Sequence, residues 1–298
     1  MGFSTIAILS PGNMGSAVGG QLNKAGYRVI SCLDERSEYT KVKAREAGFL
    51  DVETLEKMVS EADLILSILD PGQAVKVAEN VAKLIHKIEK KLPFADCNAT
   101  SPATALKLKE MIEGAGGFFI DVGIIGGAPK TQNNFPNFCT SGSQASLLDE
   151  LDGKGMFIKF IGPQIGQGSA IKICNGAFNK GAFALYTSVM MAAEHFGFTD
   201  FLRERLPKSQ AGNVEKLDEA IIRLPTLAER YVGEMEQVAE TFESIGLTPQ
   251  IHQGAADLFK FLSSSPLARQ RRDDIDPMRT STDTLKQLVL QKQDEVSK

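Results

Sequence analysis

Residues 166–196 read GQGSAIKICNGAFNKGAFALYTSVMMAAEHF, with no proline and no charged residue between Lys180 and Glu194. A helical run that is apolar on all sides is typical of a helix buried deep within a protein. Lys172 and Lys180 nevertheless lie in this run, and a buried lysine must be paired or have a lowered pKa. We therefore expect one long helix that joins two domains and holds a reactive lysine at the cleft between them.

The sequence on the two sides of this helix differs in its periodicity. Upstream, short apolar runs alternate with helical patterns from Thr5 to Ile161, which favours a doubly wound parallel sheet. Downstream, only helical patterns recur, such as the apolar face within residues 232–245. The sequence therefore predicts an α/β fold, with a parallel-sheet domain at residues 1–163 and an all-helical domain at residues 164–298.

The first predicted strand leads directly into a glycine turn. Thr5 to Leu9 is a short apolar run, and Ser-Pro-Gly-Asn-Met-Gly follows at residues 10–15, before a helical pattern. A strand, a glycine turn and a helix form the unit that places a pyrophosphate on a helix N-terminus. Ser10 replaces the first glycine of the usual Gly-x-Gly-x-x-Gly pattern, so a glycine-lined turn without a ligand is the alternative.

The end of the second predicted strand carries residues that select between NAD and NADP. Asp34 and Glu35 suit the ribose 2′-hydroxyl of NAD. Arg36 and Ser37 instead offer a guanidinium and a hydroxyl to the 2′-phosphate of NADP. We expect NADP, with NAD as the alternative.

Three later loops follow predicted strands. In a parallel sheet, ligand groups come from the carboxyl ends of strands, at the crevice where the strand order reverses. The loops that meet this condition are residues 69–72, 96–102 and 121–129.

Composition narrows the class of protein. The chain has 298 residues, 43% of them hydrophobic and 23% charged, as is typical of a globular protein large enough for two domains. A net charge of -4 and a pI near 5.6 give no general electrostatic reason to bind nucleic acid or an anionic membrane. Neither the four cysteines nor the three histidines show metal-ligand spacing, so we expect no metal. The N-terminus resembles a strand rather than a signal peptide and no segment predicts a membrane span, which favours a cytoplasmic protein.

Four motifs occur in order along residues 5–196. They are Gly12-x-Met14-Gly15, Asp96-x-Asn98 to Pro102, Asp121 through Gly126-Gly127, and Gly166-x-Gly168-x-x-x-Lys172. Together they resemble the dinucleotide loop, the substrate segments and the catalytic helix of the β-hydroxyacid dehydrogenases, the family that includes 3-hydroxyisobutyrate and 6-phosphogluconate dehydrogenases. The resemblance is closest to the 6-phosphogluconate dehydrogenase-like branch, which has its own C-terminal helical domain.

The resemblance implies a Rossmann-type domain that binds NAD(P) and a helical domain for the substrate and for homodimer formation. It also implies hydride transfer between nicotinamide and a hydroxyl-bearing carbon, with Lys172 as general base in oxidation and general acid in reduction. With the strand-end loops, it predicts cofactor contacts from Gly12, Asn13, Met14, Gly15, Arg36, Ser37, Leu69, Asp70 and Asn98. The predicted substrate contacts are Asn98, Ile125, Gly126, Gly127, Asn175, Asn179 and Lys180.

The chain departs from the family pattern in the substrate segments. Ala99, Ile125 and Gly176 stand where the family has a threonine, a serine and an asparagine. Because paired polar groups carry much of an enzyme's discrimination, we do not expect 3-hydroxyisobutyrate or 6-phosphogluconate as the substrate. Asn179 lies about 20° from Lys172 around a helix and is a candidate replacement for the lost polar groups.

Two other readings remain open. An imine reductase shares this architecture by family analogy but generally lacks the lysine, so Lys172 argues against that activity. A non-catalytic NADP-binding regulatory protein would bind nucleotide without turnover.

Overall fold

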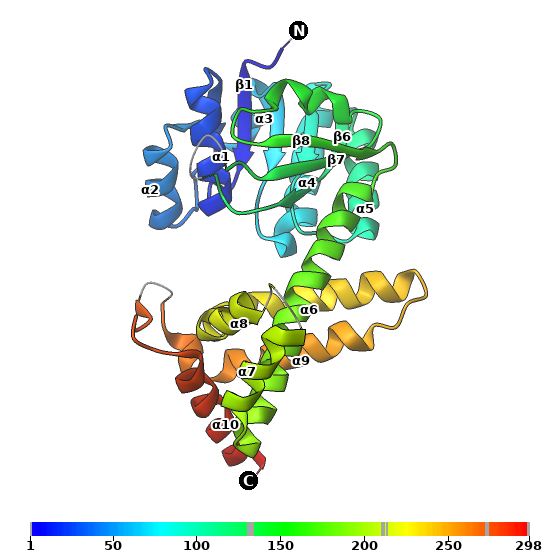
Figure 1. The fold of residues 1–298 in the computed structure, drawn as a ribbon. Coiled ribbons are helices and arrows are strands. Elements are labelled where there is room, and N and C mark those ends of the chain that lie inside the picture. Colours follow the sequence, from blue (N-terminus) through cyan, green and yellow to red (C-terminus); the bar gives the residue numbers. More distant parts are fainter. Residues whose placement is uncertain (1, 130–133, 210–211, 213, 272–273, 297–298) are drawn as a thin grey trace. The chain divides into compact units, whose positions relative to one another are not determined.

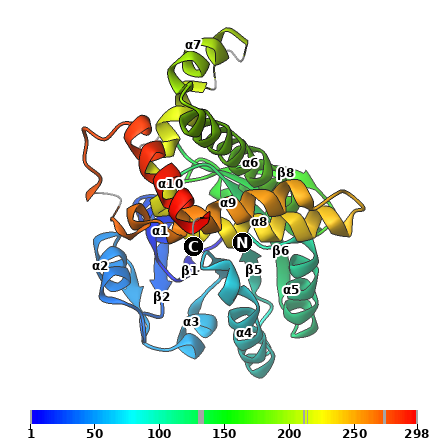
Figure 2. The ribbon, with the colours of Figure 1, turned by 90° about the horizontal axis from the view of Figure 1, so that it is seen from below.

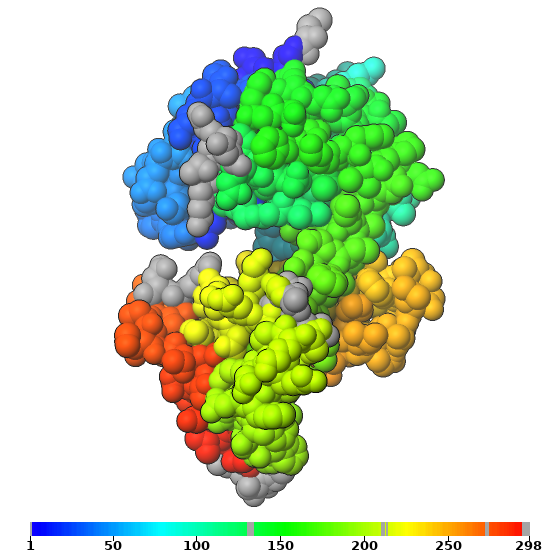
Figure 3. Space-filling view, in the orientation of Figure 1, coloured from blue at the N-terminus to red at the C-terminus, as the bar shows by residue number. Residues whose placement is uncertain are grey.

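The computed structural model describes residues 2–129, 134–209, 212, 214–271 and 274–296 (Figure 1). The chain forms two compact units, Met1–Ile173 and Cys174–Lys298. Figure 3 shows the chain in space-filling form, with unit 1 in blue to green and unit 2 continuing to red. The predicted boundary after residue 163 precedes the helix α6 (Gln167–Phe196), whereas the division falls inside α6. The reason is that the first turn of α6 is hydrogen-bonded to Asp121 in the sheet of unit 1.

Unit 1 is built on one sheet of eight strands in the order β3-β2-β1-β4-β5-β6-β7-β8. The predicted α/β class is confirmed, and a short third strand that the sequence did not predict extends the sheet. The strands are β1 (Thr5–Leu9), β2 (Arg28–Ser31), β3 (Leu50–Asp51), β4 (Leu64–Ser67), β5 (Pro93–Asp96), β6 (Phe118–Ile125), β7 (Asn137–Ser141) and β8 (Phe157–Gly162).

The sheet is mostly parallel, and β6 and β7 are the exception. These two strands pair antiparallel, with Val122 opposite Thr140. The predicted parallel sheet is therefore confirmed as mostly parallel, with one antiparallel pair that the sequence did not predict. Only residues 126–136 separate the two strands, which is fewer than the dozen or more that a crossover between parallel strands needs.

Helices cover both faces of the sheet, as the doubly wound pattern predicts. On one face, apolar side chains from β1, β4 and β6 pack against α1 and α2. On the other face, residues from the same strands pack against α3, α4 and α5, which lie along one side of the sheet in Figure 2. These helices are α1 (Asn13–Lys24), α2 (Glu38–Glu46), α3 (Leu55–Glu61), α4 (Ala74–Ile88) and α5 (Pro102–Gly114).

Unit 2 is helical throughout the residues that the structure describes. One cluster of its core gathers Tyr186 and Met190 of α6 with Val214, Ile221 and Leu285. The helices after α6 are α7 (Thr199–Ser209), α8 (Val214–Ser244), α9 (Gln250–Ser264) and α10 (Ser281–Val296). α8 ends just before Gly246, which has a φ of +79°, as expected of a glycine that terminates a helix.

The expectation that α6 is buried on all sides was wrong. Phe178 is 73% exposed and Leu185 is 68% exposed, although Met190 on another face of the helix is fully buried. Only one face of α6 contributes to the core of unit 2, so a second apolar face is left at the surface. Among the described helices, none is both long and apolar enough to cross a membrane.

Candidate functional site

The glycine turn after β1 leaves the N-terminus of α1 open. Gly12 is the N-cap residue of α1, and the first turn of the helix holds no acidic residue. The chain turns sharply here, since Ser10 has a φ of +60° and its carbonyl accepts the Gly12 N–H at 2.7 Å. The backbone N–H groups of such a first turn have no partner within the helix and are suited to phosphate oxygens.

The glycines of this turn meet two different needs. A Cβ on Gly15 would lie 3.1 Å from the Ser10 carbonyl oxygen, so Gly15 permits the tight turn. A Cβ on Gly12 would meet no described atom within 4 Å, so the space in front of the turn is open. Asn13 and Met14 complete the first turn, and Asn13 Oδ1 accepts a hydrogen bond from the Tyr39 hydroxyl at 2.6 Å. This open space beside uncapped N–H groups fits a pyrophosphate.

The turn after β2 carries Arg36 and Ser37. Ser37 is the N-cap of α2, and its hydroxyl accepts the Thr40 N–H at 3.3 Å. Arg36 sits in the turn itself, where its N–H donates to the Leu33 carbonyl at 3.2 Å.

Two cations that the sequence reasoning missed lie near this turn. Lys41 and Arg45 line a crevice of about 420 Å³ with Asp34, and both approach the Glu38 carboxylate, at 3.7 and 3.6 Å. Their spacing of four residues on the helix that Ser37 caps was the available signal in the sequence.

The loops after β4 and β5 are joined by the side chain of Asn98. Its Oδ1 accepts the Leu69 N–H at 2.7 Å, and its Nδ2 donates to Ser67 Oγ at 2.9 Å and to Asp96 Oδ1 at 2.5 Å. Both amide donors are used within the protein, so one lone pair of Oδ1 is left for a ligand. The side chain of Asp70 also forms a hydrogen bond within the protein, because its Oδ1 accepts the Gly72 N–H at 2.9 Å.

Asp96 lies beneath this loop pair and is 1% exposed. Burial raises the pKa of its carboxyl to about 7, and the charge of Asp121 adds to that rise. Hydrogen bonds from Asn98 and Thr100 act in the opposite direction on this pKa but do not outweigh the burial.

The first turn of α6 is held by Asp121, which has no exposed surface. Asp121 Oδ2 accepts the N–H groups of Gly166 and Ser169 at 2.9 and 3.0 Å, and Oδ1 accepts the Ser169 hydroxyl at 2.5 Å. Ser141 of β7 bridges the two elements, since its hydroxyl donates to Asp121 Oδ2 at 2.8 Å and accepts the Gly168 N–H at 3.0 Å. A carboxylate at a helix N-terminus is stabilised by the unpaired N–H groups and by the helix dipole.

Lys172 lies one turn further along α6. Its Nζ donates a hydrogen bond to the Ile124 carbonyl at 2.5 Å. The backbones of α6 and β6 touch at this point, because a Cβ on Gly123 would lie 2.0 Å from the Gly168 carbonyl oxygen. Burial raises the pKa of the Cys139 thiol on β7, while the charges of Lys172 and Lys159 act in the opposite direction on this pKa.

The ammonium of Lys172 and the glycine turn lie at one edge of the sheet. β1, β4, β5 and β6 are parallel, so their carboxyl ends share that edge. Ile124 is near the end of β6, and Ile125, Gly126 and Gly127 follow it directly. Gly126 has a φ of +119°, which turns the chain sharply where β6 ends.

The remaining predicted substrate residues belong to unit 2. Asn179 is exposed, and its Nδ2 donates to both the carbonyl and Oδ1 of Asn175, each at 2.8 Å. Lys180 forms an ion pair with Glu234 of α8, and its ammonium lies 5.3 Å from the centre of the Tyr231 ring. The Lys180 charge is thus compensated within unit 2. This agrees with the expectation that a lysine in this apolar run is paired. Within the described residues, no group of three or more His, Cys, Asp or Glu side chains could hold a metal ion.

Family models match two parts of the chain. Residues 5–150 match the NAD binding domain of 6-phosphogluconate dehydrogenase. Residues 193–262, within unit 2, match a domain of unknown function.

Curated relatives cover part of the chain. An uncharacterized 28.5 kDa protein of Methanothermus fervidus is 29% identical over 190 residues, which cover 64% of this chain and 71% of that protein. The 3-hydroxyisobutyrate dehydrogenase of Pseudomonas aeruginosa is 28% identical over 175 residues, which cover 57% of each chain. The match to this dehydrogenase therefore spans little more than half of its length.

Solved structures extend the similarity to the whole fold. The 3-hydroxyisobutyrate dehydrogenase of Mycobacterium tuberculosis has a TM-score of 0.71 at 19% identity, covering 97% of this chain and 99% of that one. At this identity the likeness shows the fold alone. Residues 5–150 are thus similar to the NAD binding domain of 6-phosphogluconate dehydrogenase, and the chain is distantly similar in sequence to a 3-hydroxyisobutyrate dehydrogenase.

Proposed function

We propose that this protein is an NADP-preferring oxidoreductase that transfers a hydride between nicotinamide and a hydroxy acid or a related alcohol or carbonyl compound. Lys172 acts as the general acid and base. The observation that carries the proposal is the position of Lys172 Nζ, 2.5 Å from the Ile124 carbonyl at the carboxyl edge of the parallel strands. The glycine turn, which is suited to the pyrophosphate, opens at the same edge.

The cofactor-binding residues follow from the open N-terminus of α1. The backbone of residues 12–15 would hold the pyrophosphate, and Leu69, Asp70 and Asn98 would line the path toward the nicotinamide. When bound, the nicotinamide supplies or accepts the hydride. Arg36 and Ser37 would hold the 2′-phosphate of NADP, because a guanidinium offers forked, charged donors to phosphate.

The proton is handled by Lys172. During reduction its ammonium donates a proton to the substrate oxygen while the hydride reaches the carbonyl carbon, and oxidation reverses both transfers. The Ile124 carbonyl accepts one N–H of the ammonium and so restrains the direction of Nζ. Asp121 acts on this lysine indirectly, by holding the turn of α6 that carries it.

Replacement of the lysine tests the assignment. Reduction of a panel of keto acids and aldehydes with NADPH should identify a substrate, and Lys172→Met should then lower kcat by about 10²- to 10⁴-fold, the usual contribution of a general acid or base. The dissociation constant for NADPH should not change. Lys159→Met, at an exposed lysine of β8, is the matched control and should retain the wild-type kcat.

Two outcomes would decide against this function. Wild-type turnover in Lys172→Met would remove the lysine from the chemistry, and turnover of cyclic imines by that variant would favour the imine reductase. Tight NADPH binding without turnover across the whole panel would favour the regulatory protein.

The cofactor preference has its own test. Arg36→Leu should weaken NADPH binding at least about tenfold, because one charge-assisted phosphate contact contributes more than 1.4 kcal/mol. NADH binding by the same variant should stay at the wild-type level, since NADH lacks the phosphate. Equal loss for both nucleotides would show that Arg36 supports the fold of the turn rather than the 2′-phosphate.

A further inference from the structure

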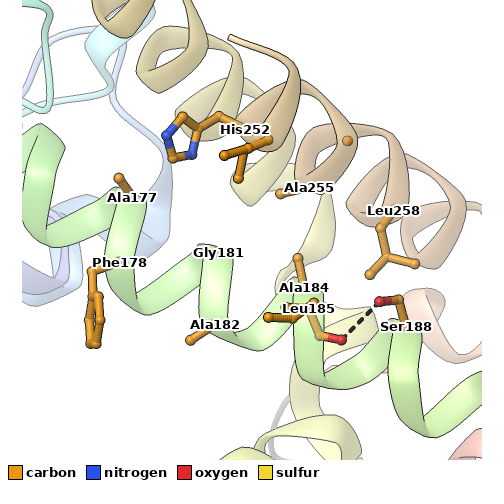
Figure 4. A pocket seen from close by; sticks show the side chains of 12 residues that line it. Ala177, Phe178, Gly181, Ala182, Ala184, Leu185, Ser188, His252, Ala255 and Leu258 are labelled. Atoms are coloured by element: carbon orange, nitrogen blue, oxygen red, sulfur yellow. Dashed lines mark hydrogen bonds between the residues drawn. The ribbon is translucent and has the colours of Figure 1, made fainter. Parts of the chain in front are cut away.

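The hollows of the two units differ in what they offer a ligand. In unit 2, a groove of about 480 Å³ between α6 and α9 is lined by small and apolar residues for the most part, and Figure 4 shows Ala184 and Leu258 pointing into it. In unit 1, a crevice of about 690 Å³ between α1 and α2 is lined by amide, hydroxyl and charged side chains as well. Asn13 lines this crevice and is also the first residue of α1, so its amide lies beside the glycine turn. The polar hollow is therefore next to the proposed nucleotide site.

The amide of Asn13 is held by a residue of the neighbouring helix. The Tyr39 hydroxyl donates to Asn13 Oδ1 at 2.6 Å, across 26 positions of the chain. Tyr39 lies in the first turn of α2, which Ser37 caps by accepting the Thr40 N–H. The Tyr39 ring is 57% exposed, and the Lys43 ammonium lies 5.9 Å from its centre. The hydrogen bond thus joins the first turns of α1 and α2.

This hydrogen bond decides which end of the Asn13 amide is available to a ligand. An asparagine side chain offers an acceptor oxygen and an NH₂ group with two donors. Because Oδ1 is turned toward the Tyr39 hydroxyl, the NH₂ group is left for another partner, and no acceptor in the described parts of the chain bonds to it. Asn13 is exposed, so a ligand in front of the glycine turn can reach these two donors.

The surroundings of Asn13 favour an anion as that partner. The first turn of α1 holds no acidic residue, and its N-cap, Gly12, makes no side-chain hydrogen bond, so the backbone N–H groups of the turn are uncapped. A Cβ on Gly12 would meet no described atom within 4 Å, which leaves the space beside Asn13 open. Glu46 lines the crevice, but its carboxylate lies 3.3 Å from the Lys43 ammonium, which compensates its charge.

We propose that Asn13 donates its side-chain NH₂ group to the pyrophosphate of the bound nucleotide, and that Tyr39 is the positioning residue that turns the amide for this contact. The inference rests on the proposed nucleotide site and adds two side chains to the backbone N–H groups of the glycine turn. The hydroxyl of Tyr39 therefore matters for the pyrophosphate and not for the 2′-phosphate.

The physical effect of Tyr39 is on the orientation of the amide. Without the Tyr39 hydroxyl, the Asn13 side chain is spread over several rotamers and over both orientations of its amide. In half of these orientations Oδ1 instead of the NH₂ group faces the pyrophosphate oxygens, and two acceptors repel each other. The apparent dissociation constant rises as the fraction of molecules in the binding orientation falls.

Titration calorimetry with ADP-ribose tests the proposal, because this ligand has the pyrophosphate but neither the 2′-phosphate nor the nicotinamide. Asn13→Ala should raise the Kd at least about tenfold, since it removes a hydrogen bond to a charged oxygen. Tyr39→Phe should raise the Kd about two- to sixfold, because it removes the orientation and not the donor. The double variant should bind no more weakly than Asn13→Ala, since Tyr39 acts only through Asn13.

Tyr27→Phe is the matched control. The Tyr27 hydroxyl also has a hydrogen-bond partner within unit 1, Lys154 Nζ at 2.6 Å, but Tyr27 precedes β2 and so lies at the opposite edge of the sheet from the glycine turn. This variant should keep the wild-type Kd for ADP-ribose.

A second ligand separates positioning from support of the fold. Tyr39 shares its turn with Arg36 and Ser37, so a purely structural role would also weaken adenosine 2′-phosphate, which has no pyrophosphate. Equal losses for the two ligands in Tyr39→Phe would overturn the proposal, as would additive losses in the double variant or a wild-type Kd for ADP-ribose in Tyr39→Phe. If the wild type binds none of ADP-ribose, NADH and NADPH, the proposed nucleotide site itself is wrong, and this inference falls with it.

Discussion

Asp121 is the residue on which the position of Lys172 depends. Its two carboxylate oxygens accept four hydrogen bonds, two from backbone N–H groups of the first turn of α6 and two from the hydroxyls of Ser141 and Ser169. The carboxylate is fully buried, so each of these bonds replaces solvation that the ion lost on folding. Asp121 thus joins β6 to the helix that carries the proposed general acid.

Asp121→Asn should destabilise the protein by roughly 2–4 kcal/mol. The NH₂ group of the amide would point toward N–H and O–H groups that now donate to the carboxylate, and the negative charge at the helix N-terminus would be lost. Urea unfolding of the variant and the wild type measures this loss. Asp149→Asn, at an exposed aspartate, is the control and should change the free energy of unfolding by less than about 0.5 kcal/mol. Equal stability of Asp121→Asn and wild type would mean that α6 is held by other contacts.

Asp96 predicts a pH dependence of stability. Burial raises its pKa from 3.8 to about 7 in the folded protein, so the folded state binds a proton more tightly than the unfolded state does. Between these two pKa values the folded chain therefore carries more protons at this site. Stability from this group is present at low pH, falls as the pH rises toward about 7 and is constant above it.

Asp96→Asn removes that dependence, because an amide does not titrate. Between pH 5 and pH 6, the free energy of unfolding of the wild type should fall relative to that of the variant by about 1.4 kcal/mol per unit rise in pH. It should be flat above pH 8. Urea unfolding at a series of pH values checks this, and parallel pH profiles for the two proteins would show that Asp96 is ionised in the folded state.

At the scale of elements, α6 and the sheet meet backbone to backbone. A Cβ on Gly168 would lie 2.7 Å from the carbonyl oxygens of both Asp121 and Cys139. The approach leaves no room for any side chain at this position, and the obstacles are backbone atoms that cannot rotate away. The two glycines, Gly123 and Gly168, therefore set the distance between α6 and β6.

Gly168→Ala should lower the free energy of unfolding by about 1–3 kcal/mol, because overpacking outweighs the better helix propensity of alanine. Gly233→Ala is the control in α8, where a Cβ would meet no described atom within 4 Å, and it should raise stability by up to about 1 kcal/mol. Thermal unfolding of the pair measures both changes. Stabilisation by both substitutions would show that α6 can move away from the sheet at little cost.

At the scale of the whole molecule, the proposed nucleotide site lies within one of the two units. The glycine turn belongs to unit 1, which has an apolar core on each face of its sheet. Unit 2 has buried residues of its own, such as Met235 and Phe259. We therefore expect substitutions at the glycine turn to change nucleotide binding and to leave the core of unit 2 intact.

Nucleotide binding should stabilise the whole protein by mass action. NADPH at 100 times its dissociation constant should add about 2.7 kcal/mol, which is visible as a rise in Tm. The same concentration of NADH should raise Tm less if Arg36 binds the 2′-phosphate. No rise in Tm with any of NADP, NADPH, NAD or NADH would contradict binding at the glycine turn. A larger rise with NADH would indicate a preference for NAD, with Asp34 and Glu35 binding the ribose.

The predictions that succeeded depend on neighbours in the chain. Periodicity within short windows identified the strands and helices of unit 1 and the helical character of unit 2, because the hydrogen bonds of these elements and their apolar faces repeat locally. The glycine turn at residues 10–15 was also recognisable, since a turn needs only adjacent residues. The predicted parallel sheet is mostly parallel, and the antiparallel pair of β6 and β7 was not predicted, because there the short connection decides the strand direction.

The sequence by itself determined the α/β class, the helical second unit and the glycine turn, because each is encoded in residues close together along the chain. Only the tertiary structure decided that Asp121 holds the start of α6, 45 to 48 positions away, and that Lys180 is paired with Glu234. It also decided that both amide donors of Asn98 are used within the protein and that one apolar face of α6 is exposed. These features depend on which distant segments meet, and that is set by the order of strands and the packing of helices rather than by any local pattern.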